Sequence, residues 1–145
     1  MPRIWRTVRT SLAVGTDIYA QGDALGTKIS FTGIPEEGII RSMVITDVDD
    51  EASVTVNVWV FESQPTGVAA NAAFALTDAD AELVQGVHLV DTDFDSINNR
   101  VKYEEMAMPY VARGGTLHVQ CELEGSATPT FAATTDVKLM LVIEH

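Results

Sequence analysis

The sequence predicts an all-β protein, a single β-sandwich of jelly-roll type with about eight strands. Three observations lead to this prediction. Apolar and polar residues alternate with a period of two along several segments, and turn-forming residues separate those segments. The chain of 145 residues also contains neither a second compositional zone nor a long linker. Because an alternating strand buries only one face, two such sheets can cover each other. We therefore expect residues 1–145 to form one domain.

The first three expected strands lie between residues 4 and 47. Residues 4–10 have a composition compatible with a strand, and residues 1–12 form a basic N-terminal segment that could extend as an arm. Residues 28–32 alternate between apolar and polar side chains, and residues 39–47 are rich in β-branched ones. Glycine and proline at positions 33, 35 and 38 mark the turn between the last two strands.

Residues 53–62 form the clearest strand, because valines at positions 54, 56, 58 and 60 point to one side. The opposite side begins polar and ends with Trp59 and Phe61. Two aromatic side chains two positions apart could form an exposed stacking platform for a sugar. We favour the other interpretation, in which a loop or a second subunit packs over this end of the strand.

The segment from 67 to 85 departs from the β pattern, since it contains seven alanines. Thr77 and the acids that follow it predict one short helical turn near residues 78–84. Phe74 and Leu76 are apolar in a segment that would otherwise be solvated. We favour the interpretation that this excursion folds back and caps one end of its own sandwich. The alternative is that it contacts another protein.

The second half of the chain predicts five further strands. Residues 87–90 and 109–111 are short, and residues 100–106 alternate unevenly. Residues 116–124 alternate regularly, which places Cys121 on the core side. In residues 137–144 one face is wholly apolar and the other half apolar.

The charge is unevenly distributed along the chain. The formal net charge is -12, yet the first ten residues contain Arg3, Arg6 and Arg9 and no acid. From residue 11 onward 6 basic residues stand against 21 acidic ones, which leaves the body at -15. In the interpretation that we favour, the arginines lie on the solvent face of a first strand. Alternatively, the segment reaches an acidic surface on a neighbouring subunit and buries Ile4 and Trp5 there.

Composition also argues against several classes of partner. An acidic body does not suit nucleic-acid binding, which depends on lysine and arginine at phosphates. No apolar stretch approaches the roughly 20 residues that cross a bilayer, and no signal-peptide run follows Met1. With one cysteine the chain can form no internal disulfide. We expect a soluble protein, made in the cytoplasm, without nucleic-acid or membrane partners.

No motif for catalysis or metal binding is present in the sequence. The serine-hydrolase, zinc-protease, dithiol and phosphate-loop signatures are all missing, and His88, His118 and His145 are isolated from one another. Residues 47–51 and 91–95 are acidic clusters, but neither has the glycine and glutamate spacing of an EF-hand calcium loop. Solvated turns are favoured over calcium sites. We predict no enzymatic activity, catalytic residue, cofactor, metal or small-molecule substrate.

An ordered series of strand and turn pieces covers most of the chain. It comprises residues 16–26, the strand end at 44–50, Val58-Trp59-Val60-Phe61-Glu62, residues 65–67 and 71–74, Met108-Pro109-Tyr110, residues 114–117 and Thr128-Pro129-Thr130. This series resembles small β-sandwich virion proteins that are encoded in the structural gene clusters of tailed bacteriophages. The pieces contain no shared contact motif, so no binding residue is transferred directly.

The resemblance implies a non-enzymatic capsid decoration or cement protein. Such a protein binds the outer surface of the assembled phage head as a homotrimer and stabilises contacts between subunits of the major capsid protein. By analogy, the N-terminal segment and the alanine-rich excursion make these contacts. The candidate partner-binding residues are therefore Arg3, Ile4, Trp5, Arg6, Arg9, Phe74 and Leu76. The alternative function is a phage tail or fibre component, or a carbohydrate-binding adhesion module that uses exposed aromatic residues.

Overall fold

The structure is a computed structural model that describes residues 1–49, 54–90, 95–96 and 100–145. Its elements are almost entirely strands, as predicted. In chain order they are β1 (Ile4–Arg6), β2 (Thr10–Ser11), β3 (Ile29–Thr32), β4 (Glu37–Asp47), β5 (Val56–Phe61), the helical turn α1 (Asp78–Ala81), β6 (Val84–Val90), β7 (Asp95–Ser96), β8 (Arg100–Val111), the 3₁₀ turn η1 (Arg113–Gly115), β9 (Thr116–Leu123) and β10 (Val137–Glu144).

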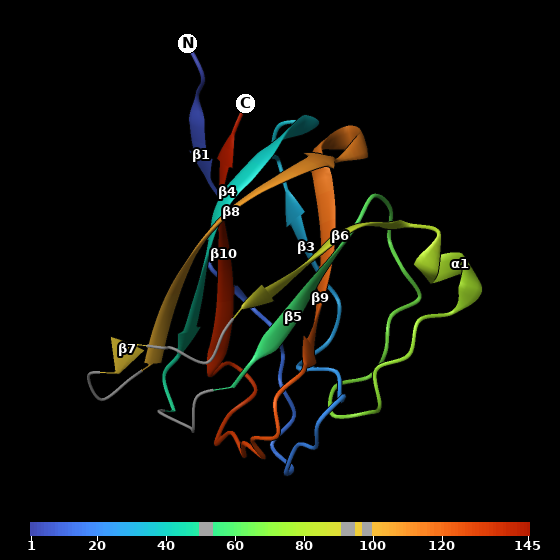
Figure 1. The fold of residues 1–145 in the computed structure, drawn as a ribbon, viewed down its shortest axis with the longest axis vertical. Coiled ribbons are helices and arrows are strands. Elements are labelled where there is room, and N and C mark those ends of the chain that lie inside the picture. Colours follow the sequence, from blue (N-terminus) through green and yellow to red (C-terminus); the bar gives the residue numbers. More distant parts are fainter. Residues whose placement is uncertain (50–53, 91–94, 97–99) are drawn as a thin grey trace.

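Two antiparallel sheets form the sandwich (Figure 1). Sheet A has the strand order β1-β10-β4-β8-β7, with β2 also pairing to β10. Sheet C has the order β3-β9-β5-β6. Every strand pair in both sheets is antiparallel. The prediction of an all-β sandwich is confirmed.

The order of the strands is that of a jelly roll. With the two-residue strands β2 and β7 set aside, eight strands remain, and in chain order sheet A reads 1-8-3-6 and sheet C reads 2-7-4-5. Successive strands therefore alternate between the sheets for most of the chain, which is the wrapping of two Greek keys in a jelly roll. The termini lie together at one end of the molecule (Figure 1).

The core lies between the two sheets and follows the period-two pattern of the sequence. Alternate residues of the central strands are completely buried, namely Val56, Val58, Val60, Leu117, Val119, Cys121, Leu123, Leu139, Leu141 and Ile143. Transfer of each such side chain from water contributes roughly 1.5 to 3 kcal/mol. A single continuous hydrophobic cluster therefore holds both sheets together.

Several elements differ from the sequence prediction in their extent. The first expected strand is divided into β1 and β2, and β6 begins at Val84, three residues earlier than expected, so the helical turn ends at Ala81. The expected strands at 100–106 and 109–111 are one strand, β8. Pro109 does not interrupt it, because β8 pairs with β7 only at Arg100 and Val101 and is a sheet edge at Pro109. A proline is tolerated in a strand where its nitrogen faces no partner.

Candidate functional site at the N-terminal edge

The N-terminal segment forms the edge of sheet A. Strand β1 pairs with β10, and beyond it Arg3 and His145 exchange two backbone hydrogen bonds of 2.8 and 3.0 Å. At its other end the buried Thr7 donates its N–H to the Leu141 carbonyl and accepts the Leu141 N–H on its hydroxyl. These bonds fix the backbone of residues 3–7 on the body of the molecule.

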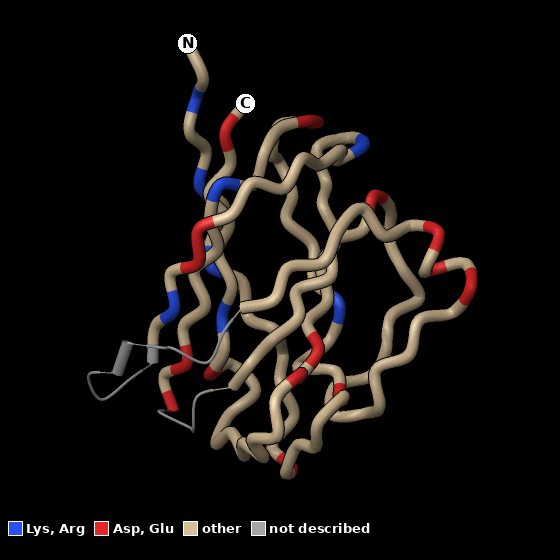
Figure 2. Tube along the Cα trace, viewed as in Figure 1, with Lys and Arg blue, Asp and Glu red and all other residues tan. Residues whose placement is uncertain are grey.

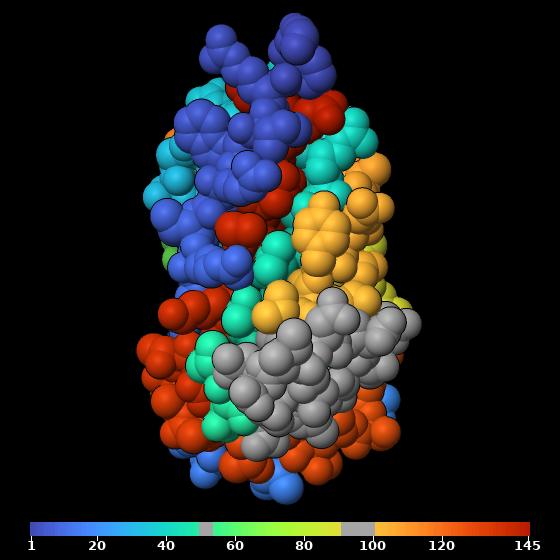
Figure 3. Space-filling view, turned by 90° about the vertical axis from the view of Figure 1, so that its left-hand side faces the viewer, coloured from blue at the N-terminus to red at the C-terminus, as the bar shows by residue number. Residues whose placement is uncertain are grey.

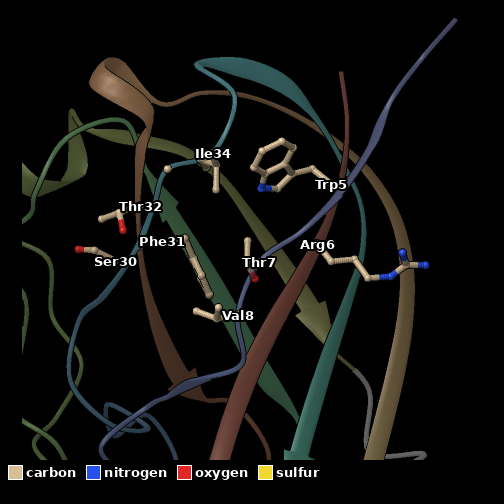
Figure 4. Close-up of a pocket in the computed structure, with 9 residues that line it drawn as sticks. Trp5, Arg6, Thr7, Val8, Ser30, Phe31, Thr32 and Ile34 are labelled. Atoms are coloured by element: carbon tan, nitrogen blue, oxygen red, sulfur yellow. The ribbon is translucent and has the colours of Figure 1, made fainter.

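Alternation along β1 sends its side chains in opposite directions (Figure 4). Trp5 points toward β3, where with Phe31, Ile34 and Val8 it lines a groove of about 310 Å³ between the edges of the two sheets. Trp5 remains 44% exposed at the rim of this groove. Arg6 also borders the groove, but its side chain extends away from Trp5, toward the outer face of sheet A (Figure 4). The segment thus presents an aromatic side chain and a cation on separate surfaces.

The three N-terminal arginines have different surroundings. Arg9 donates a hydrogen bond of 2.9 Å to the Thr46 hydroxyl and so lies across sheet A. Within the described part of the chain, Arg3 and Arg6 have no acidic partner within 4 Å. Figure 2 shows basic residues along the N-terminal segment and both signs of charge on the rest of sheet A, whereas the excursion around α1 carries only acidic ones. The N-terminal edge is therefore a local basic region on an acidic protein.

Phe74 lies elsewhere, over the outer face of sheet C, and Leu76 is half-buried two residues further along the same excursion. The ring of Phe74 packs on that of Trp59 in β5, with 5.6 Å between centroids and an angle of 31°. The Phe74 N–H also donates to the Gly22 carbonyl. The excursion thus folds back onto its own sandwich, as we favoured. It is far from β1, so the structure does not combine the seven candidate residues into one surface (Figure 1).

Two buried polar side chains attach the excursion. Gln120 of β9 accepts the Val68 N–H at 3.1 Å and donates to the carbonyls of Val68 and Gly26 at 2.7 and 3.3 Å. The carboxylate of Asp80 accepts the N–H groups of Thr66 and Gly67. Burial alone would raise the pKa of Asp80, but these hydrogen bonds outweigh it and lower the pKa below its usual range.

The aromatic pair on β5 does not form an exposed platform. Phe61 is completely buried. Trp59 packs beneath Phe74, and its indole N–H donates to Glu122 at 3.0 Å. The interpretation of this strand end as covered by a loop is therefore confirmed.

The described residues assemble no catalytic centre. His88 pairs with Glu104 at 3.1 Å across the open side of the sandwich, and His118 contacts the Ser30 hydroxyl at 2.9 Å. Burial raises the pKa of the Cys121 thiol to about 12, which leaves it protonated and unreactive. No cluster of three or more potential metal ligands occurs among these residues. Residues 50–51 of one acidic cluster and residues 91–94 of the other lie outside them.

Sequence reasoning did not identify a further surface, the outer face of sheet A (Figure 3). It carries an apolar patch on three adjacent strands, consisting of Met140 and Val142 on β10, Val44 on β4, and Val101 and Tyr103 on β8. Tyr103 is 57% exposed and Val101 39%. The half-apolar second face of residues 137–144 was the signal for this patch.

Comparison with known proteins finds no matching family model and no matching curated sequence. Among the described residues, no helix has both the length and the apolar character that a membrane span requires. The fold and the two exposed surfaces of sheet A are therefore the basis for a functional proposal.

Proposed function

We propose that this protein is a non-enzymatic virion structural protein that decorates the outer surface of an assembled bacteriophage capsid. Its partners are the major capsid protein and further copies of itself. The resemblance implies a homotrimer. The jelly-roll order supports the proposal, since this architecture recurs in viral capsid proteins. Lectins and enzymes also have jelly-roll folds, so the proposal needs support from a particular surface as well as from the fold.

The main support for the proposal comes from the surface at the N-terminal edge. It presents Trp5 at the rim of a groove and Arg3 without an acidic partner in the described chain, on a backbone fixed by hydrogen bonds to β10. A fixed backbone lowers the entropy cost of binding. Tryptophan and arginine are both enriched in binding hot spots. Many weak contacts of this kind on one shell add up through multivalency.

Substitutions test the edge better than a deletion. Removal of residues 2–10 would also remove strand β1 and the buried Thr7, and would thereby expose β10. We expect the pair Arg3→Glu and Trp5→Ala to weaken binding to capsids that lack this protein at least tenfold. Arg113→Glu is the matched control, because it reverses an exposed arginine of η1 that does not line the groove at Trp5.

A glycan array tests the alternative function. A capsid decoration protein should show no sugar preference. Sugar binding that disappears in a folded Trp59→Ala variant would instead support an adhesion module, with Trp59 released from beneath Phe74.

A further inference from the structure

We propose that copies of this chain associate with one another through the outer face of sheet A, around an axis that runs along the strands in front of that face. The inference adds a surface to the proposed homo-oligomer. It concerns the apolar patch defined above rather than the groove at Trp5. Contiguous exposed apolar surface on a soluble protein commonly marks a protein interface.

The centre of the face has the composition of an interface core. Met140, Val44 and Tyr103 form one row of adjacent apolar side chains across β10, β4 and β8, in which Tyr103 is exposed, Met140 is half-buried and Val44 between them is buried. Tyrosine and methionine are enriched in interfaces, and a half-exposed tyrosine supplies a large contact area.

The margins of the same face carry opposite charges. The next row along the strands runs from Arg6 through Val142 and Ser42 to Glu105. Arg6 on β1 and Glu105 on β8 are both exposed, and neither has an ion-pair partner within the part of the chain that the structure describes. The apolar patch therefore lies between a basic margin and an acidic margin.

This arrangement is complementary to a second copy of itself. Rotation about an axis parallel to the strands brings the β1 margin of one copy against the β8 margin of the next. This holds for a two-fold pair and for a ring of three. Arg6 of each copy then faces Glu105 of its neighbour, while the apolar patches turn toward the axis. Opposite charges at the rim favour this register over one that opposes like charges.

Ser42 lies at the centre of the row between Arg6 and Glu105 and is buried within the chain itself. Its hydroxyl is buried without a hydrogen-bond partner, the single such side-chain atom within the described ranges. The hydroxyl is therefore covered by side chains of its own chain, and the contact surface of the proposed interface consists of the more exposed side chains around it, chiefly Tyr103 and Val101.

The proposal is tested by light scattering on the purified chain without capsids, so it can fail independently of capsid binding. From about 1 to 100 µM, a range that covers moderate affinities, we expect a mass of two or three times 15.7 kDa. Tyr103→Asp should shift the protein to a monomer. Leu89→Asp is the matched control, since Leu89 is 51% exposed on sheet C, and it should leave the mass unchanged. Circular dichroism confirms that each variant is folded.

A charge exchange tests the predicted register. Arg6→Glu and Glu105→Arg should each raise the dissociation constant of self-association at least tenfold, and the double variant should recover most of that loss. A wild-type monomer at the highest concentration would overturn the proposal. So would dissociation of the Leu89→Asp variant alone, or a double variant as weak as the single ones.

Discussion

Replacement of Gln120 by methionine tests how the excursion is attached to sheet C. Methionine has a similar volume but cannot reproduce the hydrogen bonds to the N–H and carbonyl of Val68 and to the carbonyl of Gly26. Each lost bond costs about 1 kcal/mol, so we expect the free energy of unfolding to fall by about 3 kcal/mol. For a chain of this length, that loss lowers the melting temperature by about 6 to 12 °C.

Gln85 provides a matched control within the same molecule. Its side chain makes the same kind of paired contact, donating to the Val111 carbonyl at 2.8 Å and accepting the Val111 N–H at 2.6 Å. These bonds are exposed, so water can replace them. Gln85→Met should therefore cost less than about 1 kcal/mol. Urea unfolding followed by circular dichroism measures both variants, and equal losses would refute the argument from burial.

Two further predictions concern buried ionisable groups. Because hydrogen bonds lower the pKa of Asp80 in the folded protein, its carboxylate stabilises the fold above the unfolded pKa of about 4, and this stability is lost as pH falls through the folded pKa. Asp80→Asn should lower the free energy of unfolding by about 1 to 3 kcal/mol at pH 7 and by progressively less below about pH 4. Urea unfolding measures this difference at each pH. A difference that does not change with pH would contradict the proposed role of the carboxylate. Cys121, buried and with a pKa of about 12, should react with a thiol reagent at pH 8 only after unfolding, and stoichiometric labelling of the native protein would contradict its burial.

Much of the fold could be predicted from residue alternation. In β5 and β10 every second residue is apolar and buried, so pattern and structure agree directly. In β8 the pattern is uneven because Lys102 and Glu104 point to the inner side at the open margin of the sandwich. There Glu104 reaches His88 on β6. A strand at the margin can turn charged residues inward, and alternation alone does not reveal this.

The surfaces were less predictable than the fold. The three arginines identified the N-terminal edge, but the groove at Trp5 exists only because β1 and β3 are edges of different sheets. The outer patch required the pairing of β10, β4 and β8, which brings together Met140, Val44 and Tyr103 from distant parts of the chain. Its one sequence signal, the half-apolar face of residues 137–144, does not identify the neighbouring strands.

Co-sedimentation with capsids that lack this protein tests the proposed function most directly. We expect the wild-type chain to add in a fixed ratio to the major capsid protein, and the pair Arg3→Glu and Trp5→Ala to remain in the supernatant while Arg113→Glu still binds. A wild-type chain that stays in the supernatant with intact capsids, at concentrations where it is folded, would contradict the account.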